Sequence, residues 1–413
     1  MKKLFVFLLL AGALAGCRHP EIEVVDFDTF RVTSVKMADV VLPNGNLNPE
    51  IRFMEDPTPD PEPGSGAEPE TKVAYTNLIG IVREILGEIN CNTLYHIAGT
   101  YTGHDVDGSP LTLSGKLLIP KDGPVKNLVI VSHYTIGANY EAPSETFPME
   151  GIFAAKGYAV AIADYIGYGV TANRIHPYMH VESTARSVVD MALAVMPYLE
   201  KIGCKPQEKE VILAGYSQGG ATTIAVMDMI QKEYGSVFPI KKVYAGGGPY
   251  DLAATYDISM EWDRTGIPCA IPMIVQGIDI GEKLGLKMSD FFQPDLLAHY
   301  DEWINSKNYT VKQINALMKA SSLHEIMTEN GRDKSSHETA RLYQALMTNS
   351  VLDFNPGAPI YFFHSRQDRT VPFVNAEKAE EKFKGKNVRF DFGNYGEHPM
   401  GCARFIVKVY KDL

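Results

Sequence analysis

Short apolar runs alternate with segments of helical periodicity from Gly103 to Leu413. The runs that bear on function are Asn127–Ser132, Glu210–Tyr216, Pro359–His364 and Val388–Phe392. Their lengths suit buried strands, and chains that alternate in this way build a mainly parallel sheet with helices on both faces. The sequence therefore predicts an α/β fold around one central sheet.

Residues 1–17 have a different pattern. Lys2 and Lys3 precede an apolar stretch, Leu4–Leu14, that is too short for an ordinary transmembrane helix, and small residues follow it up to Cys17. This arrangement resembles a bacterial lipobox, which implies a signal peptide and a lipidated Cys17 that anchors an exported protein to a membrane of the cell envelope. The alternative is an ordinary secretory signal that is cleaved near Ala15.

Residues 18–70 form a predicted extension between this leader and the core. Asp56–Glu70 is rich in proline and acidic residues, and this composition is typical of a stiff, extended linker. Glu23–Val41 has the pattern of one or two strands, such as an accessory hairpin, and we assign it no function. The core is expected to comprise 71–254 and 348–413.

A mostly helical cap is expected at 255–347, between the two parts of the core. The segment from Ser217 to Asp368 is about twice as long as the intervening elements of a minimal core require. Helical periodicity is clearest at Val311–Met327 and His337–Met347. Most apolar side chains of such a segment pack in its core, while some would form an apolar wall for a substrate. Its Met and aromatic residues include Met260, Trp262, Met273, Met288, Phe291, Phe292, Tyr300, Trp303 and Met318.

The sequence Gly215–Gly219 matches G-x-S-x-G. It follows an apolar run and leads into the helix-patterned Ala221–Met227. In this setting the motif forms a nucleophile elbow, a sharp turn that exposes its serine at the end of a strand. The glycines keep side chains away from the tight backbone, and the following helix directs its first amides at the reacting group. Ser217 is therefore the candidate nucleophile.

A serine hydroxyl needs a histidine base and an acid that orients this base. Asp368 follows the apolar run Pro359–His364, and His398 follows the run Val388–Phe392. The order Ser, Asp, His is the one expected of α/β-hydrolases. Asp251 follows an earlier strand and is the rival acid, although an Asp at that position also suits a turn or helix cap.

Several stretches of the chain, in order, resemble the α/β-hydrolase superfamily, and more narrowly its secretory-lipase-like esterases. The similarity covers roughly 95–413, and its specific parts are the triad and the sequence A-D-Y-x-G-Y-G at Ala163–Gly169. The resemblance implies an α/β-hydrolase fold and esterase activity, and it implies no cofactor. Further matching stretches are Gly108–Gly115 with Leu118–Pro120, His133–Thr135 and His176–Tyr178.

The oxyanion of such a reaction needs two backbone amides. One is the amide of Gln218, directly after the nucleophile, and the other comes from the loop after an earlier strand. That loop begins with His133, Tyr134 and Thr135. Many relatives in the resembled family have His-Gly there, whereas this chain has a side chain at the glycine position. The second donor is therefore expected to be Tyr134 or Thr135.

Net charge and the spacing of metal-ligand residues exclude other classes of site. The formal net charge of the 413 residues is −11 and no basic stripe occurs, so a nucleic acid partner is not expected. His176 and His180 have the i, i+4 spacing of metal ligands, but the Glu of H-E-x-x-H is missing and Pro177 indicates a helix start. We expect no metal and interpret these histidines as residues that pack beside the elbow.

The remaining cysteines leave disulfide pairing open. An exported location permits disulfides among four cysteines, and three pairings exist that the sequence cannot rank. None has the close C-x-x-C spacing of a zinc site. These residues are Cys91, Cys204, Cys269 and Cys402.

Together these features predict an exported, lipid-anchored serine hydrolase that cleaves small-molecule carboxylic esters through an acyl-enzyme. Ser217 attacks the carbonyl, His398 transfers the proton and Asp368 holds the imidazole. An exported serine peptidase or amidase would use the same triad. The alternative from another class is a non-catalytic surface binding lipoprotein with a relict hydrolase fold.

Overall fold

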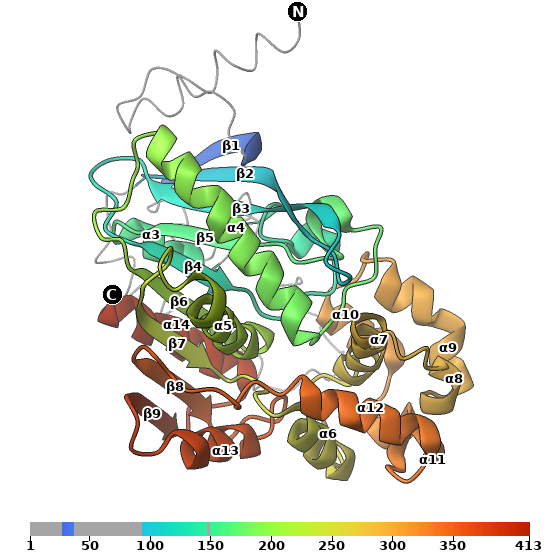
Figure 1. The fold of residues 1–413 in the computed structure, drawn as a ribbon. Coiled ribbons are helices and arrows are strands. Elements are labelled where there is room, and N and C mark those ends of the chain that lie inside the picture. The colour runs from blue at the N-terminus through green and yellow to red at the C-terminus, as the bar shows by residue number, and fades with distance from the viewer. Residues whose placement is uncertain (1–26, 37–92, 147–148) are drawn as a thin grey trace, which may run out of the picture.

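The computed structural model describes residues 27–36, 93–146 and 149–413. Their strands form one nine-stranded sheet in the order β1-β2-β3-β5-β4-β6-β7-β8-β9 (Figure 1). Neighbouring strands are antiparallel from β1 to β5 and parallel from β5 to β9. The strands are β1 Asp28–Lys36, β2 Thr93–His104, β3 Pro110–Pro120, β4 Leu128–Ser132, β5 Ala159–Ala163, β6 Val211–Tyr216, β7 Ile240–Gly246, β8 Ile360–Ser365 and β9 Val388–Gly393.

Helices cover both faces of this sheet (Figure 1). All residues of β4, β6 and β8 are buried, as expected of parallel strands with helices on either side. Leu128 and Ile130 of β4 point into the core beneath α4 and α5, whereas Val129 and Val131 point into the core beneath α3 and α14. The predicted α/β fold is therefore confirmed. These core helices are α3 Ile152–Ala155, α4 Val181–Lys201, α5 Gln218–Met229, α13 Val374–Phe383 and α14 His398–Asp412.

The strand β1 differs from the prediction for the N-terminal part. Residues 28–36 lie within the predicted extension, yet they pair antiparallel with β2 and form one edge of the central sheet. Phe27, just before β1, is buried and its ring packs edge-on against Tyr198 of α4. One of the strands expected within Glu23–Val41 is therefore present at Asp28–Lys36, where it belongs to the core sheet, and the remaining positions of that segment, on which a hairpin would depend, lie outside the described residues. The predicted leader with Cys17, the linker and Cys91 lie outside the described residues.

The segment between β7 and β8 is helical, and its helices gather to one side of the sheet (Figure 1). Backbone hydrogen bonds join it to two loops of the core. The amide of Asn139 donates to Lys307 O at 2.8 Å, and the amide of Gly266 donates to Arg369 O at 2.9 Å. Within the described part of the chain, no helix has the length and apolarity needed to cross a bilayer. The helices of this segment are α6 Leu252–Glu261, α7 Ala270–Glu282, α8 Met288–Phe291, α9 Pro294–Tyr300, α10 Val311–Met318, α11 Glu329–Arg332 and α12 His337–Thr348.

Helix α12 agrees with the predicted periodicity at His337–Met347, but the helix predicted at Val311–Met327 is too long. α10 ends at Met318, and Lys319 has a left-handed backbone with φ of 52°. A short 3-10 helix, Leu323–Glu325, then follows a capping box that begins at Ser322. The left-handed residue stops the helix, while the apolar periodicity continues through the next turn because both pieces pack on the same core.

Candidate active site

Ser217 occupies a sharp turn between β6 and α5. Its φ of 59° and ψ of −127° are rarely adopted by a residue with a side chain, and such a conformation costs about 1 to 3 kcal/mol. The backbone beside it is crowded: a Cβ on Gly219 would lie 2.0 Å from Ser132 O, and a Cβ on Gly220 would lie 2.4 Å from Gly246 O. The turn thus has the strained geometry of a nucleophile elbow and requires glycine at both positions.

Ser217, His398 and Asp368 come together from three separate loops. Ser217 Oγ lies 2.8 Å from His398 Nε2, and His398 Nδ1 lies 2.5 Å from Asp368 Oδ2. His398 is the first residue of α14, and Tyr216 fixes its position by donating from its hydroxyl to His398 O at 3.0 Å. This is the order of hydrogen bonds that activates a serine hydroxyl.

The surroundings of Asp368 keep it ionised. Its Oδ1 accepts hydrogen bonds from the amides of Thr370 and Val371, both at 2.8 Å. Burial acts to raise the pKa of Asp368, but the charge and hydrogen bond of His398 outweigh this, with smaller contributions from His364 and the Val371 amide. The pKa of Asp368 therefore lies below its usual value. A carboxylate that is ionised at neutral pH is the form that orients an imidazole base.

His364 is a second histidine beside the acid, and it was not among the residues predicted from the sequence. It lies in the fully buried strand β8, with Nε2 3.1 Å from Val371 O and 3.6 Å from Asp368 Oδ2. A carbonyl oxygen only accepts, so Nε2 carries the hydrogen. Burial lowers the pKa of His364 although Asp368 opposes this shift. A histidine within an apolar strand that leads to the acid is the sequence signal for this contact.

Asp251, the rival acid, has a different role. It is the N-cap of α6, where its Oδ1 accepts from the amide of Ala254 at 2.8 Å. Its Oδ2 lies 2.8 Å from Lys378 Nζ. Asp251 therefore caps a helix and pairs with a lysine, and Asp368 is the carboxylate that contacts His398.

The predicted oxyanion donors lie around the elbow. Gln218 is the first residue of α5, and the first amides of a helix have no acceptor within that helix. The loop that carries Tyr134 and Thr135 follows β4 directly, and the carbonyls of Ser132 and His133 pack against Gly219. The choice between Tyr134 and Thr135 as second donor stays a prediction.

His176 supports the residue after the nucleophile. Its Nδ1 lies 2.6 Å from Ile166 O and its Nε2 lies 3.0 Å from Gln218 Nε2. Because the carbonyl accepts, Nδ1 carries the hydrogen and Nε2 accepts from the Gln218 amide group. Burial, aided by the charge of Lys307, lowers the pKa of His176 to about 3, so the ring stays neutral. The ring also stacks on Tyr165, a residue of the A-D-Y-x-G-Y-G sequence.

The other histidine of the predicted pair points elsewhere. His180 Nδ1 lies 2.8 Å from Ser183 Oγ, and helix α4 begins only at Val181, after Pro177. Within the described ranges, no group of three or more His, Cys, Asp or Glu residues has a metal-binding arrangement.

Cys204, Cys269 and Cys402 form no disulfide with one another.

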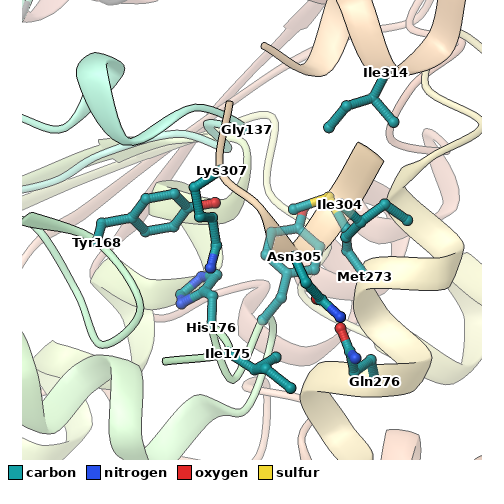
Figure 2. A pocket seen from close by; sticks show the side chains of 11 residues that line it. Gly137, Tyr168, Ile175, His176, Met273, Gln276, Ile304, Asn305, Lys307 and Ile314 are labelled. Carbon is teal, nitrogen blue, oxygen red and sulfur yellow. The ribbon is translucent and has the colours of Figure 1, made fainter. Parts of the chain in front are cut away.

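A pocket lies between the core and the helical segment 252–348 (Figure 2). On its core side, His176 contacts Gln218, and the hydroxyl of Tyr178 lies 2.7 Å from Thr135 Oγ1. Only Met273 of the Met and aromatic residues singled out in the cap lines this pocket. Its neighbours on the cap side include Ile304, Lys307 and Ile314.

Most of the other Met and aromatic residues of the cap pack within it. Phe291 and Phe292 are in ring contact, and Phe292 also contacts Tyr300. The Tyr300 hydroxyl donates to Pro272 O at 2.7 Å. For this cluster the interpretation as core packing is correct, whereas the cap side of the pocket combines the apolar Met273, Ile304 and Ile314 with the polar Gln276, Asn305 and Lys307.

The sheet order, the elbow after β6, the acid after β8, the histidine after β9 and the helical insertion between β7 and β8 define an α/β-hydrolase. The chain matches the secretory lipase family over residues 144–398 and belongs to this family.

Relatives and solved structures are consistent with this assignment. The secreted triacylglycerol lipase LIP5 of Malassezia furfur is 24% identical over 259 residues, which are 61% of this chain and 63% of that lipase. This chain thus spans less than two thirds of the length of that relative. The rice cell wall degrading esterase LipA from Xanthomonas oryzae superimposes with a TM-score of 0.70 at 23% identity, covering 80% of this chain and 93% of LipA. Candida antarctica lipase A gives a TM-score of 0.57 at 16% identity, with 76% and 75% covered.

Proposed function

We propose that this protein is a serine hydrolase that cleaves carboxylic esters through an acyl-enzyme. The observation that carries the proposal is the hydrogen-bonded series from Ser217 Oγ through His398 to Asp368, with distances of 2.8 Å and 2.5 Å. The strained turn at Ser217 and membership of the secretory lipase family support the same conclusion. The names of the similar lipases and of the esterase favour esters as substrates.

In the proposed reaction, Ser217 Oγ attacks the ester carbonyl carbon while His398 Nε2 takes its proton. The amides of Gln218 and of Tyr134 or Thr135 stabilise the oxyanion that forms. The tetrahedral intermediate breaks its bond to the alcohol, which leaves with the proton from His398. A water molecule, deprotonated by His398, then attacks the acyl-enzyme; the bond to Ser217 Oγ breaks, His398 returns the proton to Oγ, and the carboxylic acid is released.

We also propose an extracellular or cell-envelope location with a lipid anchor at Cys17. The match to the secretory lipase family and the secreted lipase of Malassezia furfur support export. The lipobox-like residues 1–17 support the anchor. The expected partners are then a small-molecule ester and, through the lipid, a membrane.

Matched ester and amide substrates test the activity. Purified wild-type protein is assayed with 4-nitrophenyl butyrate and butyryl 4-nitroanilide, beside Ser217→Ala. We expect ester turnover that Ser217→Ala lowers by about 10⁶-fold, as in serine hydrolases whose nucleophile is removed. Comparable turnover of the anilide would favour a peptidase or amidase. Absence of turnover of either substrate by folded wild-type protein would favour a relict binding protein.

A further inference from the structure

Lys307 is a buried lysine at the interface between the core and the cap. The residue is 6% exposed and lines the pocket described above. Across residues 27–36, 93–146 and 149–413, no carboxylate forms an ion pair with its ammonium group. Burying a charge without a counter-ion is costly, and such charges in clefts are frequently functional.

In the described part of the chain, the contacts of Lys307 include no negatively charged group that would neutralise its ammonium group. Its carbonyl already ties the cap to the core by accepting from the amide of Asn139 at 2.8 Å. Its Nζ donates to Arg174 O at 3.1 Å and lies 5.1 Å from the centre of the Tyr168 ring. An ammonium group has three donors, so it can bind a further acceptor beside Arg174 O.

The backbone of Lys307 is also unusual. Its φ of 58° is left-handed, a conformation that glycine or asparagine adopts more readily than lysine. Figure 2 shows the side chain extending from the cap toward the space between Tyr168 and His176. The turn thus directs a long cationic side chain from the cap onto the core side of the pocket.

The pocket is connected to two candidate oxyanion residues through side chains that line it. Its lining residue His176 contacts Gln218, and its lining residue Tyr178 contacts Thr135. Gly137 of the same oxyanion loop also lines it. A group in this pocket is therefore separated from Gln218 and Thr135 by the side chains of His176 and Tyr178, while Met273, Ile304 and Ile314 supply apolar walls.

We propose that Lys307 binds a carboxylate group of the substrate, so that this protein acts on esters whose acyl or alcohol part also carries an acidic group. The inference deepens the proposed ester hydrolysis and rests on it. Burial lowers the pKa of Lys307 to about 8, so the side chain is still mainly protonated at neutral pH.

Two pairs of substrates test the proposal and distinguish its two forms. For the acyl side, 4-nitrophenyl hydrogen glutarate is compared with the neutral amide analogue 4-nitrophenyl 4-carbamoylbutanoate. For the alcohol side, the butyrate ester of 4-hydroxybenzoate is compared with that of 4-hydroxybenzamide. The ratio of kcat/KM for the acidic and neutral members is measured in wild type, Lys307→Met and Lys307→Arg. Differences in intrinsic reactivity cancel when the ratios of the variants are compared.

Lys319→Met is the matched control, because Lys319 is an exposed cap lysine that also has a left-handed backbone. We expect Lys307→Met to lower the ratio at least about tenfold for one substrate pair, since a buried charge would lose its partner. Lys307→Arg should retain most of the ratio, and Lys319→Met should not change it. An equal ratio in wild type and Lys307→Met for both pairs would overturn the proposal. If Lys307→Met does not fold, Lys307→Gln replaces it with the same criteria.

Binding measurements separate this inference from the proposed activity. The affinity of the acidic and neutral esters for the Ser217→Ala protein is measured by calorimetry, with and without Lys307→Met. Tighter binding of an acidic ester that requires Lys307 supports the inference even if wild type cleaves neither ester. Equal affinity for the acidic and neutral esters, with or without Lys307, contradicts it.

Discussion

Asp368 and Asp251 both follow strands of the parallel part of the sheet, but only Asp368 contacts His398. We predict that Asp368→Asn lowers kcat for an activated ester by about 10⁴-fold, because the amide leaves the imidazole in the wrong tautomer. Asp251→Asn should change kcat less than about tenfold and lower thermal stability only slightly, because asparagine still caps α6 and only the ion pair with Lys378 is lost. Steady-state kinetics and thermal unfolding of both variants check this. A larger kcat loss in Asp251→Asn would mean that Asp251 is the acid.

His176 is predicted to position Gln218 without touching the substrate ester. Replacing its acceptor nitrogen with the apolar ring of His176→Phe should lower kcat about tenfold to a hundredfold and leave KM nearly unchanged, because a displaced oxyanion donor weakens only the transition state. His176→Gln keeps an acceptor at the same reach and should recover part of kcat. Equal kcat in the Phe and Gln variants, both folded, would show that the contact with Gln218 does not matter for the reaction.

Ser217, Asp368 and His398 could be predicted from the sequence because each has a local signal. Ser217 lies in a motif, and Asp368 and His398 each follow an apolar run. It placed His176 near the elbow but did not find its contact with Gln218, which joins residues 42 positions apart. The contact of His364 with Asp368 was missed as well. The contact of His176 with Gln218 depends on how loops from different strands meet, which no local pattern records, whereas His364 lies four residues before Asp368 at the end of one strand and its position in that apolar run was the available signal.

At the scale of elements, the cap and the oxyanion loop meet at Gly137. A Cβ there would lie 2.5 Å from Tyr309 O and 2.8 Å from Val311 N, so Gly137→Ala must push α10 away from the loop. We predict a loss of about tenfold to a hundredfold in kcat/KM, because small displacements of positioning groups are costly. Gly235→Ala is the control, since its Cβ would meet nothing closer than 3.5 Å. Activity of Gly137→Ala equal to that of the control would mean that this close contact does not govern catalysis.

The elements themselves were predictable where periodicity is strong and uninterrupted. β4, β6 and β8 are continuous apolar runs, and the sequence identified them because both faces of each strand are buried. The helix expected up to Met327 fails at Lys319, since a left-handed lysine leaves no compositional signal comparable to glycine. β1 exposes Phe30 together with polar residues, so it shows no clear alternation, and its role as an edge strand depends on pairing with the distant β2.

At the scale of the whole molecule, residues 1–17 are expected to fix where the enzyme acts. We predict that Cys17→Ser abolishes labelling with a fatty-acid probe in a bacterial host and moves the protein out of the membrane fraction, because the thiol that receives the lipid is absent. Esterase activity per molecule should persist, since the triad does not include this residue. Unchanged fractionation and unchanged labelling of Cys17→Ser would contradict the lipid anchor and favour an ordinary secretory signal.

The central claim is that Ser217 forms the covalent intermediate. Its most direct test is to treat the purified protein with a fluorophosphonate and to locate the adduct by peptide mass spectrometry. We predict one adduct per molecule, on Ser217, with none on folded Ser217→Ala. An adduct on a different residue, or none on active wild-type protein, would contradict the assignment of Ser217 as the nucleophile.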